Sequence, residues 1–170
     1  RVHDFRESRL HKAFRVFERL RDERHAVFAA YTVENAGWLD DFALFAALKA
    51  HYHDRSWTTW DKDLRARKPA AMRAARESLA GAIRYHKFVQ FVFDTQWSSL
   101  RRYCNERNIG LIGDIPIFVA HDSADVWARP HLFALDKAGE PKFVSGYPPD
   151  AFSPNGQRWG HPQYEWRAHA

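Results

Sequence analysis

Two stretches of the sequence combine residue types that can act on a ligand. In the first, Asp114 lies within the apolar, β-branched run Leu111–Val119, between Gly113 and Pro116. Chemistry in parallel α/β folds collects where strands end, because a side chain there reaches solvent while the strand stays rigid. Asp114 is therefore a candidate site residue. The alternative is that its carboxylate accepts hydrogen bonds from the following backbone amides and only forms a turn.

The second stretch, residues 146–162, is rich in glycine and proline and carries three aromatic residues. They are Tyr147, Phe152 and Trp159. Aromatic rings on a stiff loop offer flat apolar faces, and Asp150, Gln157 and Arg158 add directional hydrogen-bonding groups. This combination suits a sugar, which presents both C–H faces and hydroxyl edges. A lid that packs on its own protein explains such a loop equally well.

Other polar clusters predict structural roles. Asp122, Ser123 and Asp125 have the residue types of a metal-binding loop, but the same pattern is a helix N-cap followed by an acid in the first turn. We predict capping. His51 and His53 have no cysteine or carboxylate cluster beside them, so we expect them to be solvated rather than to bind zinc. The sequence therefore predicts no metal site and no cofactor.

The composition excludes several classes of protein. The chain has 170 residues, of which 45% are hydrophobic, and a net charge of +5. It can bury a sizeable core, so it is not a disordered chain. Its basic residues are mixed with acids, as at Arg15–Arg24, which predicts a solvated face and no nucleic-acid binding. The longest apolar run, Phe42–Leu48, is far shorter than the roughly 20 residues of a membrane helix. The single cysteine, Cys104, agrees with a reducing cytoplasm.

Glycine and proline divide the chain near Asn108. Residues 1–107 hold two of the eight glycines and one of the eight prolines, so we expect a helical first part and a loop-rich second part. Apolar residues three and four apart predict three helix faces. The faces are Leu10, Phe14, Phe17 and Leu20; Trp38, Phe42, Phe45 and Leu48; and Val89, Phe93, Trp97, Leu100 and Cys104.

The boundaries of these helices follow from capping signals. Ser8 is the expected N-cap of the first helix, and Pro69 is the expected first residue of another. The last helix spans about Ile83–Arg107, and its continuity with the Pro69 helix through Gly81 stays open. Trp57 and Trp60, three residues apart, are expected to fill a core.

The second part opens with a predicted strand. The run Leu111–Val119 is apolar without alternation, which is typical of a strand buried on both faces of a parallel sheet. Regular strand pairing should end by Pro116. The long helix before this strand, together with the strand, makes half of a βαβ crossover. A short helix is predicted at Ser123–Trp127. Leu132–Leu135 and Lys142–Ser145 predict a surface hairpin.

Two longer motifs resemble a known family. Residues 112–119 (IGDIPIFV) with 122–127 (DSADVW), and residues 146–160 (GYPPDAFSPNGQRWG), are similar to the amylomaltases, 4-α-glucanotransferases of the α-amylase superfamily. Shorter matches, such as Trp57-x-x-Trp60, extend the resemblance over nearly the whole chain.

The resemblance implies an α/β fold, part of a (β/α)8 TIM barrel with an inserted, largely α-helical subdomain and a Pro/Gly-rich active-site loop. Residues 1–107 would form the helical subdomain and a barrel helix. Residues 108–170 would form a barrel strand, a short helix, a hairpin and the active-site loop. The implied reaction moves α-1,4-glucan segments to glucose or another glucan by a retaining double displacement. The implied partners are maltooligosaccharides and α-1,4-glucans, with neither nucleic acid nor membrane.

By the same resemblance, five residues of this chain bind substrate. They are Asp114, Asp150, Phe152, Gln157 and Trp159. The family's Arg-x-Asp-His nucleophile motif is absent, so we expect the nucleophile and the acid/base to follow Ala170 in a longer protein. The isolated chain is therefore expected to be inactive.

Three positions depart from the family's usual pattern and bear on acceptor preference. Ala151 replaces a bulky aromatic residue, His161 a common asparagine, and Arg129 a small polar residue or histidine. Two alternatives stay open. One is an α-glucan hydrolase of the same superfamily, since water and sugar compete for one intermediate. The other is a non-catalytic glucan-binding fragment.

Overall fold

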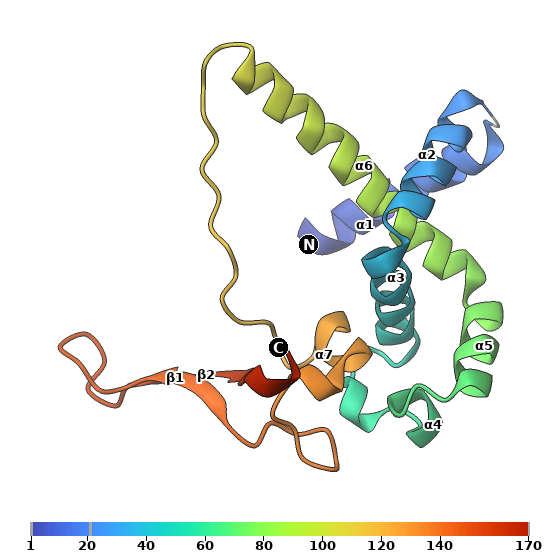
Figure 1. Ribbon diagram of the computed structural model, residues 1–170. Coiled ribbons are helices and arrows are strands. Elements are labelled where there is room, and N and C mark those ends of the chain that lie inside the picture. The colour runs from blue at the N-terminus through green and yellow to red at the C-terminus, as the bar shows by residue number, and fades with distance from the viewer. Residues whose placement is uncertain (1, 21, 170) are drawn as a thin grey trace. The chain divides into compact units, whose positions relative to one another are not determined.

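The computed structural model describes residues 2–20 and 22–169 (Figure 1). The contacts within the chain divide it into two compact units. Unit one comprises residues 1–47 and 75–113, and unit two comprises residues 48–74 and 114–170. Each unit has its own buried aromatic residues. No helix within the described ranges has the length and apolar character needed to cross a membrane.

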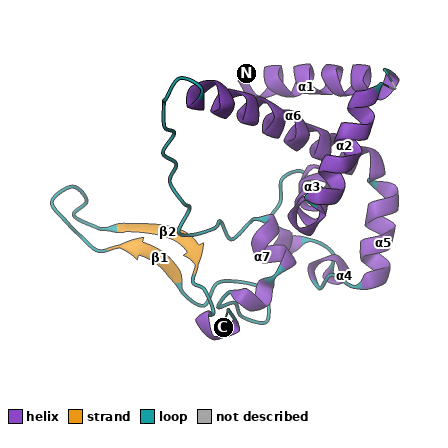
Figure 2. Cartoon of the chain, turned by 45° about the horizontal axis from the view of Figure 1, so that its top comes forward, coloured by secondary structure: helices purple, strands orange, loops and turns teal. Residues whose placement is uncertain are grey.

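Unit one is built from helices (Figure 2). They are α1 (Val2–Arg19), α2 (Glu23–Glu34), most of α3 (Ala36–His51), the end of α5 (Pro69–Ser78) and α6 (Ala80–Asn105). Helices α1 and α2 pack against the long helix α6. Phe17, Phe28 and Phe88, one from each of these helices, form the buried centre of the packing. The rings of Phe17 and Phe28 meet edge to face with centroids 5.4 Å apart, a favourable aromatic geometry.

The apolar spacing predicts α3 and α6 correctly, and Pro69 predicts the start of α5. Helix α5 begins at Pro69, and α6 follows it as a separate helix after Leu79, which settles the question left open at Gly81. Asn108 has a φ of +55° just beyond the end of α6. The Ile109 N–H donates to the Cys104 carbonyl oxygen at 3.0 Å. Asparagine tolerates the left-handed region, so Asn108 stops the helix where the sequence predicts.

The N-cap predicted at Ser8 is wrong, because α1 already begins at Val2. Contacts that the spacing does not reveal stabilise the extra turns. The Glu7 carboxylate lies 3.8 Å from His11 Nε2, one turn further along the helix, and it accepts a hydrogen bond from the Tyr85 hydroxyl of α6 at 2.9 Å. The packing on α6 therefore favours a helix that starts earlier than the apolar face does.

Unit two consists of short elements. They are η1 (Trp57–Thr59), α4 (Lys62–Arg65), α7 (Ala124–Ala128), η2 (Pro130–Leu132), β1 (Val144–Tyr147), β2 (Gln157–Pro162) and η3 (Trp166–Ala168). Trp57 and Trp60 are buried, as predicted, together with Trp127. The Trp127 indole N–H donates to the Leu64 carbonyl oxygen at 3.1 Å, and its ring meets that of Trp60 edge to face. Three indoles therefore form the centre of this unit.

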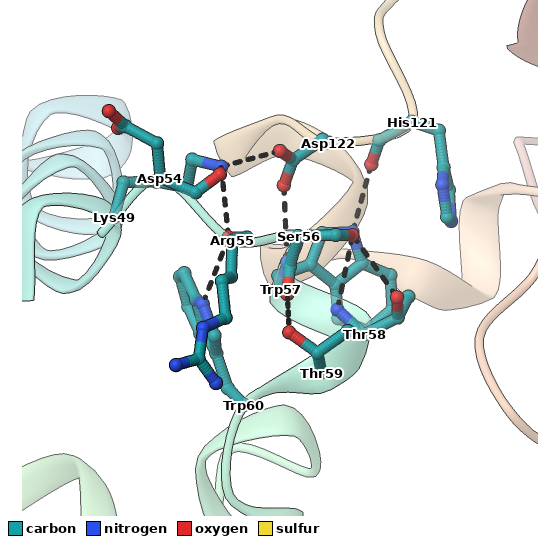
Figure 3. Close-up of polar contacts among 10 residues, drawn as sticks. All are labelled: Lys49, Asp54, Arg55, Ser56, Trp57, Thr58, Thr59, Trp60, His121 and Asp122. Carbon is teal, nitrogen blue, oxygen red and sulfur yellow. Dashed lines mark hydrogen bonds and ion pairs between the residues drawn. The ribbon is translucent and has the colours of Figure 1, made fainter. Parts of the chain in front are cut away.

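A polar network ties the chain before α7 to the turn that follows α3 (Figure 3). The Asp122 carboxylate accepts from Lys49 Nζ at 2.6 Å and from the Trp57 backbone N–H at 3.2 Å. Lys49 Nζ also donates to the carbonyl oxygens of Asp54 and Arg55, at 2.5 and 2.9 Å. Asp122 thus links two segments far apart in the sequence.

The capping prediction is confirmed for Ser123 and Asp125. The Ser123 side chain accepts from the Val126 N–H, and Asp125 is the acid in the first turn of α7. Asp122 stands outside this cap and makes the long-range bonds described above. Nothing in local spacing signals that role, because its partners are Lys49 and Trp57.

Asp122→Ala is expected to destabilise the full-length protein by about 1–2 kcal/mol. The reason is that a half-buried ammonium loses its charged partner and a backbone N–H loses its acceptor. Urea unfolding measures the change. Asp125→Ala, which removes a neighbouring carboxylate from the helix N-terminus, serves as the control and should cost well under 1 kcal/mol. Equal effects of the two substitutions would contradict the proposed importance of the network.

The prediction of a strand at Leu111–Val119 is wrong for this structure. Within the described ranges this segment is neither helix nor strand, and Ile112, Ile115 and Ile117 are exposed. A strand forms only where another strand accepts and donates its backbone hydrogen bonds. The two strands that the structure describes pair with each other and leave this segment without such a partner.

The predicted hairpin is only partly correct. A turn forms at residues 136–140, but the flanking segments share only a single bridge, Leu135 with Pro141. Pairing goes no further because Phe133 bridges Tyr164 and the Ala134 N–H donates to the Gln163 carbonyl oxygen at 2.9 Å. β1 pairs instead with β2 in an antiparallel hairpin, shown in orange in Figure 2. The sequence places these β2 residues in an irregular loop.

Candidate binding hairpin

The β1–β2 hairpin presents the second candidate stretch. Gly146 pairs with Arg158, and Tyr147 pairs with Gln157. Glycine is required at the close approaches between the strands. A Cβ at Gly146 would lie 2.6 Å from the Gln157 carbonyl oxygen, and one at Gly156, where φ is +66°, would lie 2.5 Å from the Tyr147 oxygen. The glycines therefore fix the register that displays the aromatic side chains.

Three aromatic side chains of this hairpin are open to solvent. Phe152 is 95% exposed, and Tyr147 and Trp159 are each 48% exposed. The rings of Tyr147 and Trp159 stack at 25° with centroids 6.5 Å apart. The Trp159 indole N–H donates to Gln157 Oε1 at 2.9 Å. Trp159 and Gln157 thus hold each other on one strand, with Tyr147 beside them.

Asp150 shapes the loop that carries Phe152. Its Oδ1 accepts from the backbone N–H groups of Phe152 and Ser153, at 3.0 and 2.6 Å. The Ser153 hydroxyl in turn donates to the Gly156 carbonyl oxygen at 2.8 Å. These bonds close a tight turn around the carboxylate, as aspartate does in Asx turns. Asp150 therefore fixes the backbone from which the Phe152 ring projects.

Asp114 lies apart from this cluster. It is exposed and forms no hydrogen bond or ion pair with any described residue. The turn-forming alternative for Asp114 therefore finds no bond to support it. The structure brings Asp150, Phe152, Gln157 and Trp159 together on one hairpin but joins Asp114 to none of them directly.

An aromatic stack anchors the segment that carries Asp114 to the end of the hairpin. Phe118 lies parallel to His161 of β2 with ring centroids 5.8 Å apart. The Tyr164 hydroxyl donates to the Ile117 carbonyl oxygen at 3.1 Å. Asp114 precedes Ile117 by three residues, so their Cα atoms are within about 10 Å. The segment can thus place Asp114 near the base of the hairpin.

The sequence analysis names His161 and Tyr147 but does not predict the contacts by which they support this arrangement. His161 Nδ1 and the Ser145 hydroxyl share a hydrogen bond of 2.9 Å across the hairpin. The His161 ring also stacks on Phe118. Tyr147 supports the Trp159 ring. Both follow from the strand register. Residues 157–162 show no alternation of apolar and polar residues, and the glycines and prolines around them favour a loop, so the sequence carried no clear signal of this strand.

No group of three His, Cys, Asp or Glu side chains in residues 2–20 and 22–169 is arranged to hold a metal ion. His51 and His53 are exposed, as expected for solvated side chains. The chemistry available on the hairpin is therefore stacking and hydrogen bonding. An open arrangement of rings with amide and carboxylate groups can bind a ligand that has flat C–H faces and hydroxyl groups.

Comparisons with known proteins agree over the whole chain. The 4-alpha-glucanotransferase family model matches residues 1–170. A 4-alpha-glucanotransferase of Thermus thermophilus is 46% identical over 158 residues, covering 92% of this chain and 32% of that protein. One from Aquifex aeolicus is 41% identical over 168 residues, covering 99% of this chain and 33% of that protein.

A solved structure shows the same likeness. An amylomaltase from Streptococcus agalactiae, determined in complex with acarbose, matches with a TM-score of 0.91 and 38% identity. The match covers 98% of this chain and 33% of that one. The chain thus spans about a third of the length of the relatives it matches.

Proposed function

This chain belongs to the 4-alpha-glucanotransferase family, and we propose that the protein containing it transfers α-1,4-glucan segments to glucose or another glucan. The substrates are maltooligosaccharides and α-1,4-glucans. The exposed aromatic hairpin is the observation that carries this proposal. Its rings suit the C–H faces of glucose units, and Gln157 and Asp150 supply hydrogen-bonding groups for the hydroxyls.

The proposed fold of the whole protein is a (β/α)8 barrel with an inserted helical subdomain. Residues 1–107 contribute the subdomain and a barrel helix, and residues 108–170 contribute a barrel strand with the active-site loop. The match to the S. agalactiae amylomaltase supports this proposal, since it extends over 98% of the chain. In the whole protein the segment Leu111–Val119 pairs with strands from the remainder, which would cover its exposed isoleucines.

The reaction we propose is a retaining double displacement. It requires a nucleophilic carboxylate and an acid/base carboxylate about 5 Å apart, so that a glycosyl-enzyme forms and is then resolved by a sugar hydroxyl. We assign both to the remainder of the protein. The isolated chain then supplies only substrate contacts and is inactive by itself.

The five substrate-binding residues have distinct proposed roles. Phe152 and Trp159 stack on glucose units, and Gln157 holds the Trp159 indole while offering its amide N–H groups to hydroxyls. Asp150 presents Phe152, and Asp114 binds the donor sugar near the hairpin base. Ala151 leaves the stacking to Phe152 and Trp159 alone at this loop.

The lone buried Cys104 supports a reducing compartment such as the cytoplasm.

Product analysis with the full-length protein and maltotriose tests the proposal. Transfer yields glucose together with glucans longer than maltotriose. Glucose and maltose without any longer glucan would instead identify an α-glucan hydrolase, because water would then be the acceptor. If neither set of products forms, the proposed activity is wrong.

A further inference from the structure

Unit two contains a pocket lined by Trp57 and by the turn at residues 136–139. Its volume is about 480 Å³, within the range of small-molecule sites. Trp57, Phe133 and Leu135 supply apolar lining, and none of the five proposed glucan contacts lines it. The pocket is therefore separate from the hairpin residues assigned to substrate.

The polar lining of this pocket is predominantly cationic. Lys62, Arg65 and Lys137 line it, along with His131. Neither Lys62 nor Lys137 forms an ion pair with a described residue. Asp136 is the one carboxylate among the described residues that line the pocket. The three permanent cations therefore outnumber the acid.

Asp136 is already engaged in its own turn. Its Oδ1 accepts from the backbone N–H groups of Ala138 and Glu140, at 2.8 and 2.9 Å. The Glu140 and Ala138 hydrogen bonds lower the pKa of the Asp136 carboxyl below its usual value, so it remains a carboxylate that stabilises the turn. It does not neutralise the lysines that flank the pocket by a direct ion pair.

Arg65 brings a donor without a partner. Its Nη1 donates to the Thr58 carbonyl oxygen at 2.9 Å, which fixes the guanidinium. Its Nε is buried and has no hydrogen-bond partner among the described residues. Arg65 is thus held in position, and its permanent charge stays beside the pocket that the residue lines.

The turn that forms one wall of the pocket is rigid. Gly139, with φ at +90°, lies directly on the Trp57 ring, where a Cβ would approach within 2.7 Å. The Gly139 carbonyl oxygen is hydrogen-bonded to His121 Nε2 at 2.7 Å. The wall that carries Lys137 is thus held in place before any ligand arrives, which lowers the entropic cost of binding.

We propose that this pocket binds a phosphate monoester of a small metabolite. Such a group carries a charge of about −1.5 to −2 and three terminal oxygens, which suits a pocket lined by three permanent cations. Guanidinium and phosphate match in hydrogen-bonding geometry, and lysines add charge. The remaining volume accommodates a body about the size of a monosaccharide against the apolar wall.

Calorimetric titration of the full-length protein with glucose 6-phosphate tests the proposal, with inorganic phosphate and glucose as separate titrants. Glucose 6-phosphate should bind saturably, inorganic phosphate more weakly, and glucose should not compete. Added acarbose, the compound bound in the S. agalactiae amylomaltase structure, should leave the affinity unchanged if it binds at the proposed glucan site. Lack of binding, or displacement by acarbose or glucose, would overturn the proposal.

A pair of double variants locates the site. K62Q/K137Q should weaken glucose 6-phosphate binding at least ten-fold, because two charge-assisted contacts are lost. K12Q/K68Q removes the same charge from exposed positions outside the pocket lining and should change affinity less than two-fold. Equal weakening by both variants would assign the binding to general charge and would refute a built site. Transferase activity is measured for both as the check of folding.

Discussion

Trp127→Ala is expected to lower the free energy of unfolding of the full-length protein by about 3–5 kcal/mol, the usual cost of removing a buried tryptophan. Trp127 is fully buried. The substitution leaves a large cavity beside Trp60, and it leaves the Leu64 carbonyl oxygen without the indole donor that now lies 3.1 Å away. The Arg67 guanidinium, 4.3 Å from the centre of the ring, also loses its cation–π contact.

Urea unfolding measures this loss, with Trp166→Ala as the matched control. Trp166 lies in the same unit but is 71% exposed. Its removal should therefore cost no more than about 0.5 kcal/mol. A loss below 1 kcal/mol for Trp127→Ala would mean that the three-indole core is not what stabilises this unit.

Trp159→Ala is expected to reduce transfer efficiency on maltotriose roughly 5- to 150-fold, which corresponds to about 1–3 kcal/mol. This prediction rests on the proposed glucan contact. The Trp159 ring is half exposed on β2, and its hairpin contacts are the Tyr147 ring and the Gln157 side chain. A sugar stacked on it depends on that ring, since Ala151 offers no aromatic neighbour. The fold depends on it much less.

Trp38→Ala provides the control for this experiment. Trp38 is 44% exposed, and its indole N–H donates to Asn35 Oδ1, a bond of the same type as that between Trp159 and Gln157. Its loss should leave kcat/KM within two-fold of the parent. Melting temperatures are recorded for both variants. A large fall in melting temperature with unchanged kinetics for Trp159→Ala would assign Trp159 to the fold instead of the substrate.

Local signals predict α3, α5 and α6, but they miss α2 and the start of α1. Pro69 marks a helix start because proline lacks the N–H that a first turn leaves unpaired, and Asn108 marks a stop because it tolerates positive φ. The burial of Trp57 and Trp60 was likewise predictable, since tryptophans at helical spacing usually fill cores. These features depend on neighbours within about one helical turn.

Features that depend on distant partners were not predictable in the same way. Leu111–Val119 has the composition of a strand, but composition does not supply the neighbour that a strand needs. The β1–β2 register depends on two glycine contacts across the hairpin, and these were obscured in a segment rich in turn-forming residues. The candidate aromatic residues were identified from type alone, whereas the stack of Tyr147 on Trp159 required the register.

The Lys49 network has a consequence for how this chain can diverge. The ammonium group has three protons, and Lys49 Nζ has three acceptors: the Asp122 carboxylate and the carbonyl oxygens of Asp54 and Arg55. In arginine the N–H groups lie in one plane and on different nitrogens, so they cannot reach the same three acceptors from one point. Arginine is therefore a poor replacement for Lys49. A sequence that loses Asp122 leaves a charge with no counter-ion. Lys49 and Asp122, 73 residues apart, are therefore expected to change together. A variant that has changed only one of them should be less stable than the sequences before and after both changes.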